Sequence, residues 1–234
     1  MTERPDNGRS FVMELEARVL RTGPVGATLL PMEVDMIGPL GKFGVVKLPE
    51  IKTVPSGTNV HVTPQKIAIT NQEAFQAFVK AIQIEEKIVL HLDNGKGKIK
   101  ALFMSANILY KKDVDIIGMN GPQIEIVKTE SGPDGTFKNT LKILNPSPLE
   151  ITVPPNTFHY IDEEGTVVAE QHGELPIVRG DSYHEVTGKV LSKNPKGKLR
   201  LVGVDVEKES WMKQTIKFFD GVVNLTPELQ AQFA

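Results

Sequence analysis

The sequence contains no cysteine. This absence excludes disulfide bonds, a thiolate nucleophile and cysteine-ligated zinc. No stretch approaches the roughly 18 consecutive apolar residues of a membrane span, and residues 1–10 lack the apolar core of a signal peptide. We therefore expect the chain as given to be soluble, and to be either cytoplasmic or the soluble part of a membrane-anchored protein.

An excess of either charge is also missing. The chain has 27 basic and 29 acidic residues, which leaves a formal net charge of −2. Such a chain has no global field that would attract a long polyanion, so we expect no nucleic-acid partner. The hydrophobic fraction of 40% and the length of 234 residues are typical of a folded protein with two domains of ordinary size.

Catalytic and cofactor-binding motifs are not found. There is no Gly-x-Ser-x-Gly motif, and the run Gly95-Lys96-Gly97-Lys98 precedes no helix, whereas phosphate-binding loops aim amides from a helix N-terminus. No two histidines have the i,i+4 spacing of helical metal ligands. A carboxylate and an imidazole from Glu170 and His172, or from His184 and Glu185, would suit metal binding or proton transfer, but the preferred interpretation is that these are half-exposed polar residues of strands. We expect no metal and no cofactor.

The first half of the chain alternates apolar and polar residues over short segments, which predicts strands. Apolar residues then recur at helical spacing, so a helix is expected over 71–84, with Thr70 and Glu73 as a capping box. The run Asp93-Asn94-Gly95 predicts a hairpin turn after a strand at 87–92.

Residues 131–135 are the richest run of turn formers and predict the domain boundary. Beyond it, a helix is expected over 207–219, and strands are expected at 137–144, 149–153, 156–161, 166–171, 183–191 and 198–204. A weak similarity of Met32–Val62 to Thr157–Val186 indicates duplication. The predicted fold is therefore mostly β, with two tandem immunoglobulin-like β-sandwich domains of one short helix each, at 11–130 and 136–226.

Polar and aromatic residues gather in the second half. Four of them are candidate ligand-binding residues, because aromatic groups beside a few polar ones suit an apolar or amphipathic ligand: Tyr160, Arg179, His184 and Trp211. In the alternative interpretation, Trp211 closes one end of a sandwich core and Arg179 shapes a turn with Asp181.

Several segments carry a family resemblance. They are Leu141–Ile151 with its Asn-Pro-Ser-Pro turn, Ala169–Gln171, Pro176–Gly180 and Leu201–Gly203. Together they resemble an uncharacterised fungal family of tandem β-sandwich proteins related to group-two late-embryogenesis-abundant and water-stress-hypersensitivity domains. Similar fungal proteins commonly carry an upstream transmembrane helix. A membrane partner is therefore expected only if such an anchor precedes this chain.

The leading functional hypothesis is a non-enzymatic binding or structural protein that binds lipid or another apolar small molecule. One alternative is a cofactor-independent enzyme of fungal small-molecule metabolism, of the pericyclase or isomerase type, in which the four candidate residues hold the substrate. Another is a protein–protein adaptor that uses exposed strand edges.

Overall fold

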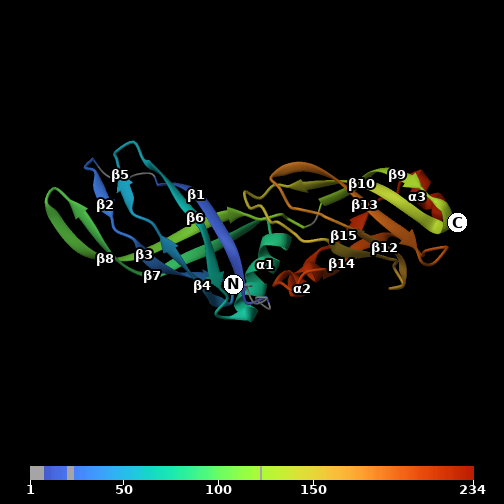
Figure 1. The fold of residues 1–234 in the computed structure, drawn as a ribbon, viewed down its shortest axis with the longest axis horizontal. Coiled ribbons are helices and arrows are strands. Elements are labelled where there is room, and N and C mark those ends of the chain that lie inside the picture. The colour runs from blue at the N-terminus through green and yellow to red at the C-terminus, as the bar shows by residue number, and fades with distance from the viewer. Residues whose placement is uncertain (1–7, 20–23, 122) are drawn as a thin grey trace, which may run out of the picture. The chain divides into compact units, whose positions relative to one another are not determined.

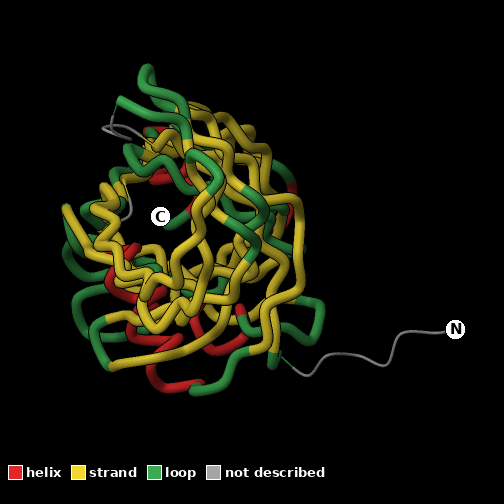
Figure 2. The backbone as a smooth tube through the Cα atoms, turned by 90° about the vertical axis from the view of Figure 1, so that its left-hand side faces the viewer, coloured by secondary structure: helices red, strands yellow, loops and turns green. Residues whose placement is uncertain are grey.

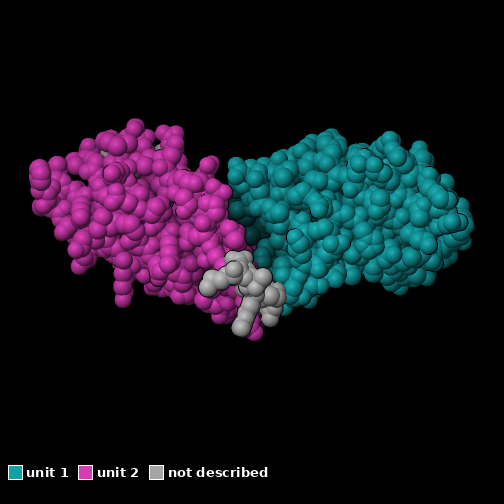
Figure 3. Space-filling model, viewed as in Figure 1, with its two compact units in different colours: residues 1–8, 79–88, 116–234 teal, residues 9–78, 89–115 magenta. Residues whose placement is uncertain are grey.

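The computed structural model describes residues 8–19, 24–121 and 123–234, and strands make up most of them (Figures 1 and 2). The prediction of a mostly β protein is confirmed, and its several sheets are consistent with a β-sandwich architecture. The chain divides into two compact units (Figure 3). Unit 1 comprises residues 1–8, 79–88 and 116–234, and unit 2 comprises residues 9–78 and 89–115.

The main sheet of unit 2 is built from long strands that proline interrupts. Its elements are β2 (Ala27–Leu29), β3 (Met32–Gly38), β4 (Gly41–Leu48), β5 (Ile51–Thr53), β7 (Lys87–Ala101) and β8 (Met104–Ile117). Thr28 pairs with Lys100 and Asp35 pairs with Asp93 in one continuous register, so β2 and β3 form a single line broken at Pro31. In the same way, β4 and β5 form a line broken near Pro49. A proline has no N–H to offer a neighbouring strand, which explains both interruptions.

The run Gly95-Lys96-Gly97-Lys98 lies within β7, and the hairpin turn predicted at 93–95 is wrong. Asn94 has a positive φ of 58° and donates through Nδ2 to Asp35 Oδ2 at 3.0 Å, which gives a local irregularity without reversing the chain. A Cβ on Gly95 would lie 2.6 Å from Val34 Cγ1, so a larger residue does not fit there. Lys96 and Lys98, which alternate with these glycines, therefore face outward and are exposed.

The second sheet of unit 2 pairs β1 (Ser10–Val19) with β6 (Thr58–Ala68). Helix α1 (Gln72–Ile84) follows, close to the range predicted for it. Its N-terminus is capped by Asn71, whose Oδ1 accepts from Ala74 N at 3.1 Å, in place of the predicted Thr70. Phe75 of this helix stacks on Phe11 of β1 with ring centroids 5.1 Å apart, which joins the helix to the small sheet.

Unit 1 contains one antiparallel sheet of seven strands in the order β15-β14-β11-β12-β13-β10-β9. The bounds are β9 (Gln123–Ser131), β10 (Thr136–Asn145), β11 (Asn156–Ile161), β12 (Val167–Gly173), β13 (Gly180–Val190), β14 (Leu199–Val206) and β15 (Asp220–Val223). Thr226, just after β15, donates to Thr129 of β9 at 2.7 Å. The two outer strands are thus brought together, and the sheet wraps around a core that includes Phe158, Leu141 and Leu201.

The connections of unit 1 differ from the predictions. Residues 131–135 contain a short helical turn, η1 (Pro133–Gly135), that joins the paired strands β9 and β10, whereas the compact units divide near residues 115 and 116. The strand predicted at 149–153 is reduced to a bridge between Ile151 and Ile177.

The helices of unit 1 also differ. The helix predicted over 207–219 is limited to α2 (Met212–Thr215) and η2 (Ile216–Phe218). A physical reason is that Gly203 of β14 donates its N–H to Phe219 O at 2.9 Å, which ties the end of this segment to the sheet. A further helix, α3 (Pro227–Gln232), was not predicted.

Candidate functional site

Tyr160 lies on β11 and is completely buried. Its hydroxyl donates to Gln171 Oε1 at 2.6 Å and accepts from Asn139 Nδ2 at 3.0 Å. Burial raises the pKa of Tyr160 far above its usual value, so the phenol stays neutral in the folded protein. Tyr160 is therefore part of the core and not a surface ligand group.

The hydrogen bonds of Tyr160 continue across the sheet. Asn139 Oδ1 accepts from Thr129 Oγ1 at 2.6 Å, and Thr129 Oγ1 in turn accepts from Thr226 Oγ1. Thr226 also caps α3, because its Oγ1 accepts from Leu229 N at 3.2 Å. This buried polar chain links four strands to the C-terminal helix, and its role is structural.

The other three predicted residues lie on separate parts of unit 1. Arg179 precedes β13, where its Nε donates to Pro148 O at 2.9 Å and lies 3.4 Å from Glu150 Oε1. Its partners are thus in the 148–150 loop and not at Asp181. His184 is half-buried on β13, and burial lowers its pKa. Trp211 is half-buried and directly precedes α2.

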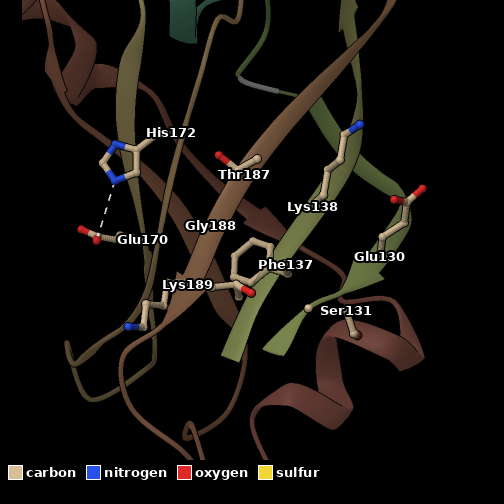
Figure 4. Close-up of a pocket in the computed structure, with 11 residues that line it drawn as sticks. Glu130, Ser131, Phe137, Lys138, Glu170, His172, Thr187, Gly188 and Lys189 are labelled. Atoms are coloured by element: carbon tan, nitrogen blue, oxygen red, sulfur yellow. Dashed lines mark ion pairs between the residues drawn. The ribbon is translucent and has the colours of Figure 1, made fainter. Parts of the chain in front are cut away.

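An open pocket of about 520 Å³ lies on the outer face of the unit 1 sheet (Figure 4). Its walls include Lys138 of β10, His172 of β12 and Lys189 of β13. Figure 4 shows Lys138 and Lys189 extending to opposite sides of Phe137. Lys138 is already paired with Glu185 at 2.8 Å. The charged groups of this pocket do not converge on one point, which makes it a weak candidate for a small ligand.

A stronger candidate is the turn between β7 and β8 in unit 2. The two strands are joined by Leu102 and Phe103 alone, and both have positive φ, 45° and 66°. A two-residue loop with these backbone angles is a type I′ turn, which normally carries Asn-Gly. Large apolar residues are disfavoured at positive φ, so turn chemistry does not explain their presence here.

The turn forms the centre of an exposed apolar surface, which we call the apolar end. Its members are Val25, Val54, Leu102, Phe103 and Met104. The Phe103 side chain is fully exposed, and Leu102 and Met104 are exposed to 66% and 71%. Figure 1 shows the green β7–β8 turn at the same end of unit 2 as the start of β2 and the end of β5. Exposed apolar groups gathered at one end of a unit make this end a candidate interaction surface.

Lysines lie on two of the strands that lead to the apolar end, β5 and β7. Residues 24–31, 50–58 and 96–109 carry four lysines, at positions 52, 96, 98 and 100, and a single carboxylate, Glu50. A hollow of about 520 Å³ lies beside the turn, and its lining includes Lys52, Lys100 and Leu102–Ser105. The predicted site residues did not include this region. The hairpin turn was expected at 93–95, so the turn at Leu102 and Phe103 was not predicted. The available signal was the alternation of Lys96, Lys98 and Lys100, followed directly by the four apolar residues Ala101–Met104.

None of the helices in the described part of the chain combines the length and the apolar character that crossing a bilayer requires. In the same residues, no three histidine or carboxylate side chains gather as a metal site would need.

Comparison with known families assigns the chain to one family. The model of the family described as "Protein of unknown function (DUF3712)" matches residues 41–160, which is just over half of the sequence. The chain therefore belongs to this family. The matched region runs from the start of β4 to Tyr160 in β11, and it includes every member of the apolar end except Val25. A comparison with curated protein sequences finds no match.

Likeness to solved structures is distant. An exo-chitosanase of Amycolatopsis orientalis is 11% identical, with a TM-score of 0.28, over 90% of this chain and 25% of that chain. A class 5 fimbriae chaperone is 10% identical, with a TM-score of 0.19, over 84% of this chain and 89% of that one. The chain spans about a quarter of the chitosanase. At these TM-scores the likenesses carry no argument about function.

Proposed function

We propose that this member of the DUF3712 family is a non-enzymatic binding protein that docks on a lipid membrane surface through the apolar end of unit 2. The observation that carries the proposal is Phe103, which is fully exposed at the tip of a long hairpin, in a backbone conformation that disfavours a large side chain. A side chain at such a position contributes nothing to the core. Its burial in a bilayer would recover about 1.5–3 kcal/mol.

The charges around the tip support a membrane as the partner. The turn is flanked by lysines, and Lys96, Lys98 and Lys100 have no ion-pair partner among the described residues. Apolar groups beside lysines match an anionic bilayer, in which the apolar groups enter the acyl region and the ammonium groups meet the headgroups. We also propose that both units are β-sandwich domains related to late-embryogenesis-abundant domains. Both units are largely antiparallel β structure, which supports this part of the proposal.

Flotation of the full chain with phosphatidylcholine vesicles that contain an anionic lipid tests the proposal. We expect the wild type to float with the vesicles, and Phe103→Ser to bind roughly 10- to 100-fold more weakly, because one large side chain no longer leaves water. Thermal unfolding of the variant should be unchanged or slightly improved.

A matched control is Val12→Ser. Val12 is exposed to 71%, like Met104. It lies in β1 and pairs with Lys66 of β6, far along the strand from the pair Val19 and Thr58, which is the end nearest the apolar end. The control should bind like the wild type. Equal binding by Phe103→Ser and the wild type, or equal losses in Phe103→Ser and Val12→Ser, would refute docking through the apolar end.

A further inference from the structure

A row of three side chains crosses the outer face of the unit 2 sheet beside the apolar end. Thr28 of β2 pairs with Lys100 of β7 on one side and with Lys52 of β5 on the other. Directly paired residues in adjacent strands project to the same face. Since neighbouring strands lie about 4.8 Å apart, the two lysines stand about 10 Å apart, with a hydroxyl between them.

This row forms the floor of the hollow beside the turn. The hollow is lined by Thr28, Lys52 and Lys100, and its wall continues through Leu102–Ser105. Thr53 also lines it, but the Thr53 hydroxyl bonds the backbone of Ala27 at 3.1 Å and so holds β5 against β2. Two flexible lysine side chains on either side of a hydroxyl can bring their ammonium groups to an oxyanion with more than one charge.

The existing charge pairing leaves this position positive. Lys52 lies 3.5 Å from Glu50, and both side chains are largely exposed, so this pair contributes little. Lys100 has no ion-pair partner among the described residues. The hollow therefore presents two cations against one carboxylate, in a region where that carboxylate is the only one.

We propose that this hollow binds the terminal phosphate of a phosphomonoester lipid headgroup, such as that of phosphatidic acid. The inference rests on the proposed membrane docking and adds a headgroup class to it. A phosphomonoester has an uncapped phosphate that can enter between Lys52 and Lys100, whereas a diester phosphate is covered on both sides. Because the hollow's wall is made by Leu102, Phe103 and Met104, a headgroup held there leaves the apolar end directed toward the acyl chains.

The test compares vesicles of phosphatidylcholine alone with vesicles that contain phosphatidic acid or phosphatidylglycerol at matched surface charge. We expect the wild-type chain to bind phosphatidic acid vesicles most tightly. The double variant Lys52→Gln/Lys100→Gln should weaken that binding by about 30-fold, as expected for two lysines near an anionic surface. It should also lose the preference for phosphatidic acid over phosphatidylglycerol.

The matched control is Lys96→Gln/Lys98→Gln. It removes the same charge from the same face of β7 but does not touch the hollow. The control should bind more weakly to both anionic vesicles while it retains the preference for phosphatidic acid. If both double variants lose affinity equally and neither changes the preference, the surface is merely basic, and the headgroup site is overturned while membrane docking stands.

Other outcomes distinguish a lipid headgroup from free phosphate and from a second copy of the chain. If the wild type binds no vesicle of any composition, the proposed function fails, and the headgroup inference fails with it. If inorganic phosphate alone saturates NMR shifts at Thr28 and Lys100 while vesicles do not bind, the hollow is a site for free phosphate and the lipid assignment is overturned. Concentration-dependent dimerisation that Phe103→Ser abolishes, without vesicle binding, would assign the apolar end to a second copy of the chain.

Discussion

Removal of the Tyr160 hydroxyl tests the buried polar chain of unit 1. In Tyr160→Phe the ring remains, but Asn139 Nδ2 loses its acceptor and Gln171 Oε1 loses its donor. Both side chains are completely buried, so water cannot replace the lost partners. An unsatisfied buried group costs about 1–3 kcal/mol, so the two together should lower the free energy of unfolding of unit 1 by about 2–6 kcal/mol.

Urea unfolding followed by tryptophan fluorescence measures this effect, because the only tryptophan, Trp211, lies in unit 1. The midpoint should fall without a change in slope. Tyr183→Phe is the control, since Tyr183 is exposed on β13 and should leave the midpoint unchanged. A loss below about 0.5 kcal/mol in Tyr160→Phe would show that the cavity relaxes or that the chain contributes no net stability.

The alkaline limit of stability gives a second readout for Tyr160. The pKa of Tyr160 is raised in the folded state, whereas in the unfolded chain it is near 10. The stabilising effect of the neutral phenol is therefore complete below about pH 10 and is lost as the pH rises above that value. The wild type should lose stability above this pH more steeply than Tyr160→Phe, and parallel pH curves would contradict the assignment.

Three further predictions concern other residues. Asp162→Asn should lower the melting temperature of unit 1 at neutral pH. The Asp162 carboxylate accepts backbone N–H bonds, of which that of Lys196 lowers its pKa most. The wild type should therefore lose its stability advantage over Asp162→Asn as the pH falls below about 4. Melting temperatures of both proteins at several pH values check this expectation. Thr226→Ala should cost about 0.5–2 kcal/mol and expose the α3 amides to hydrogen exchange. Leu102→Asn/Phe103→Gly should raise the melting temperature of unit 2 and abolish vesicle binding in the flotation assay.

Local sequence patterns predicted the elements whose signals are short-range. The apolar spacing of α1 and the alternation in β10 identified these elements nearly to their ends. Helix α3 was also within reach, since Thr226-Pro227-Glu228 is the usual start of a helix, with an N-cap threonine and proline in the first turn. These signals depend only on neighbours within one turn of helix or one strand.

The remaining features depend on contacts between distant strands. Asp93-Asn94-Gly95 has the composition of a hairpin turn, yet Asn94 bonds Asp35 of β3 and the strand continues. The structural role of Tyr160 similarly depends on its inward position on β11, where its hydroxyl bonds Asn139 and Gln171. No local pattern reveals these contacts. The predicted ligand residues were selected by chemical type alone, so a core tyrosine and an exposed loop arginine were grouped together.

The apolar end breaks two local rules of sequence and structure. A type I′ turn made of Leu102 and Phe103 disagrees with turn propensity, and the exposed Phe103 disagrees with burial. Natural chains tend to break such rules at functional sites, and the cost is carried by stability elsewhere. Two independent rules are broken at the same two residues, and three lysines precede them in β7. A folding role explains neither violation, and this is the reason for proposing that the surface serves in binding rather than in folding.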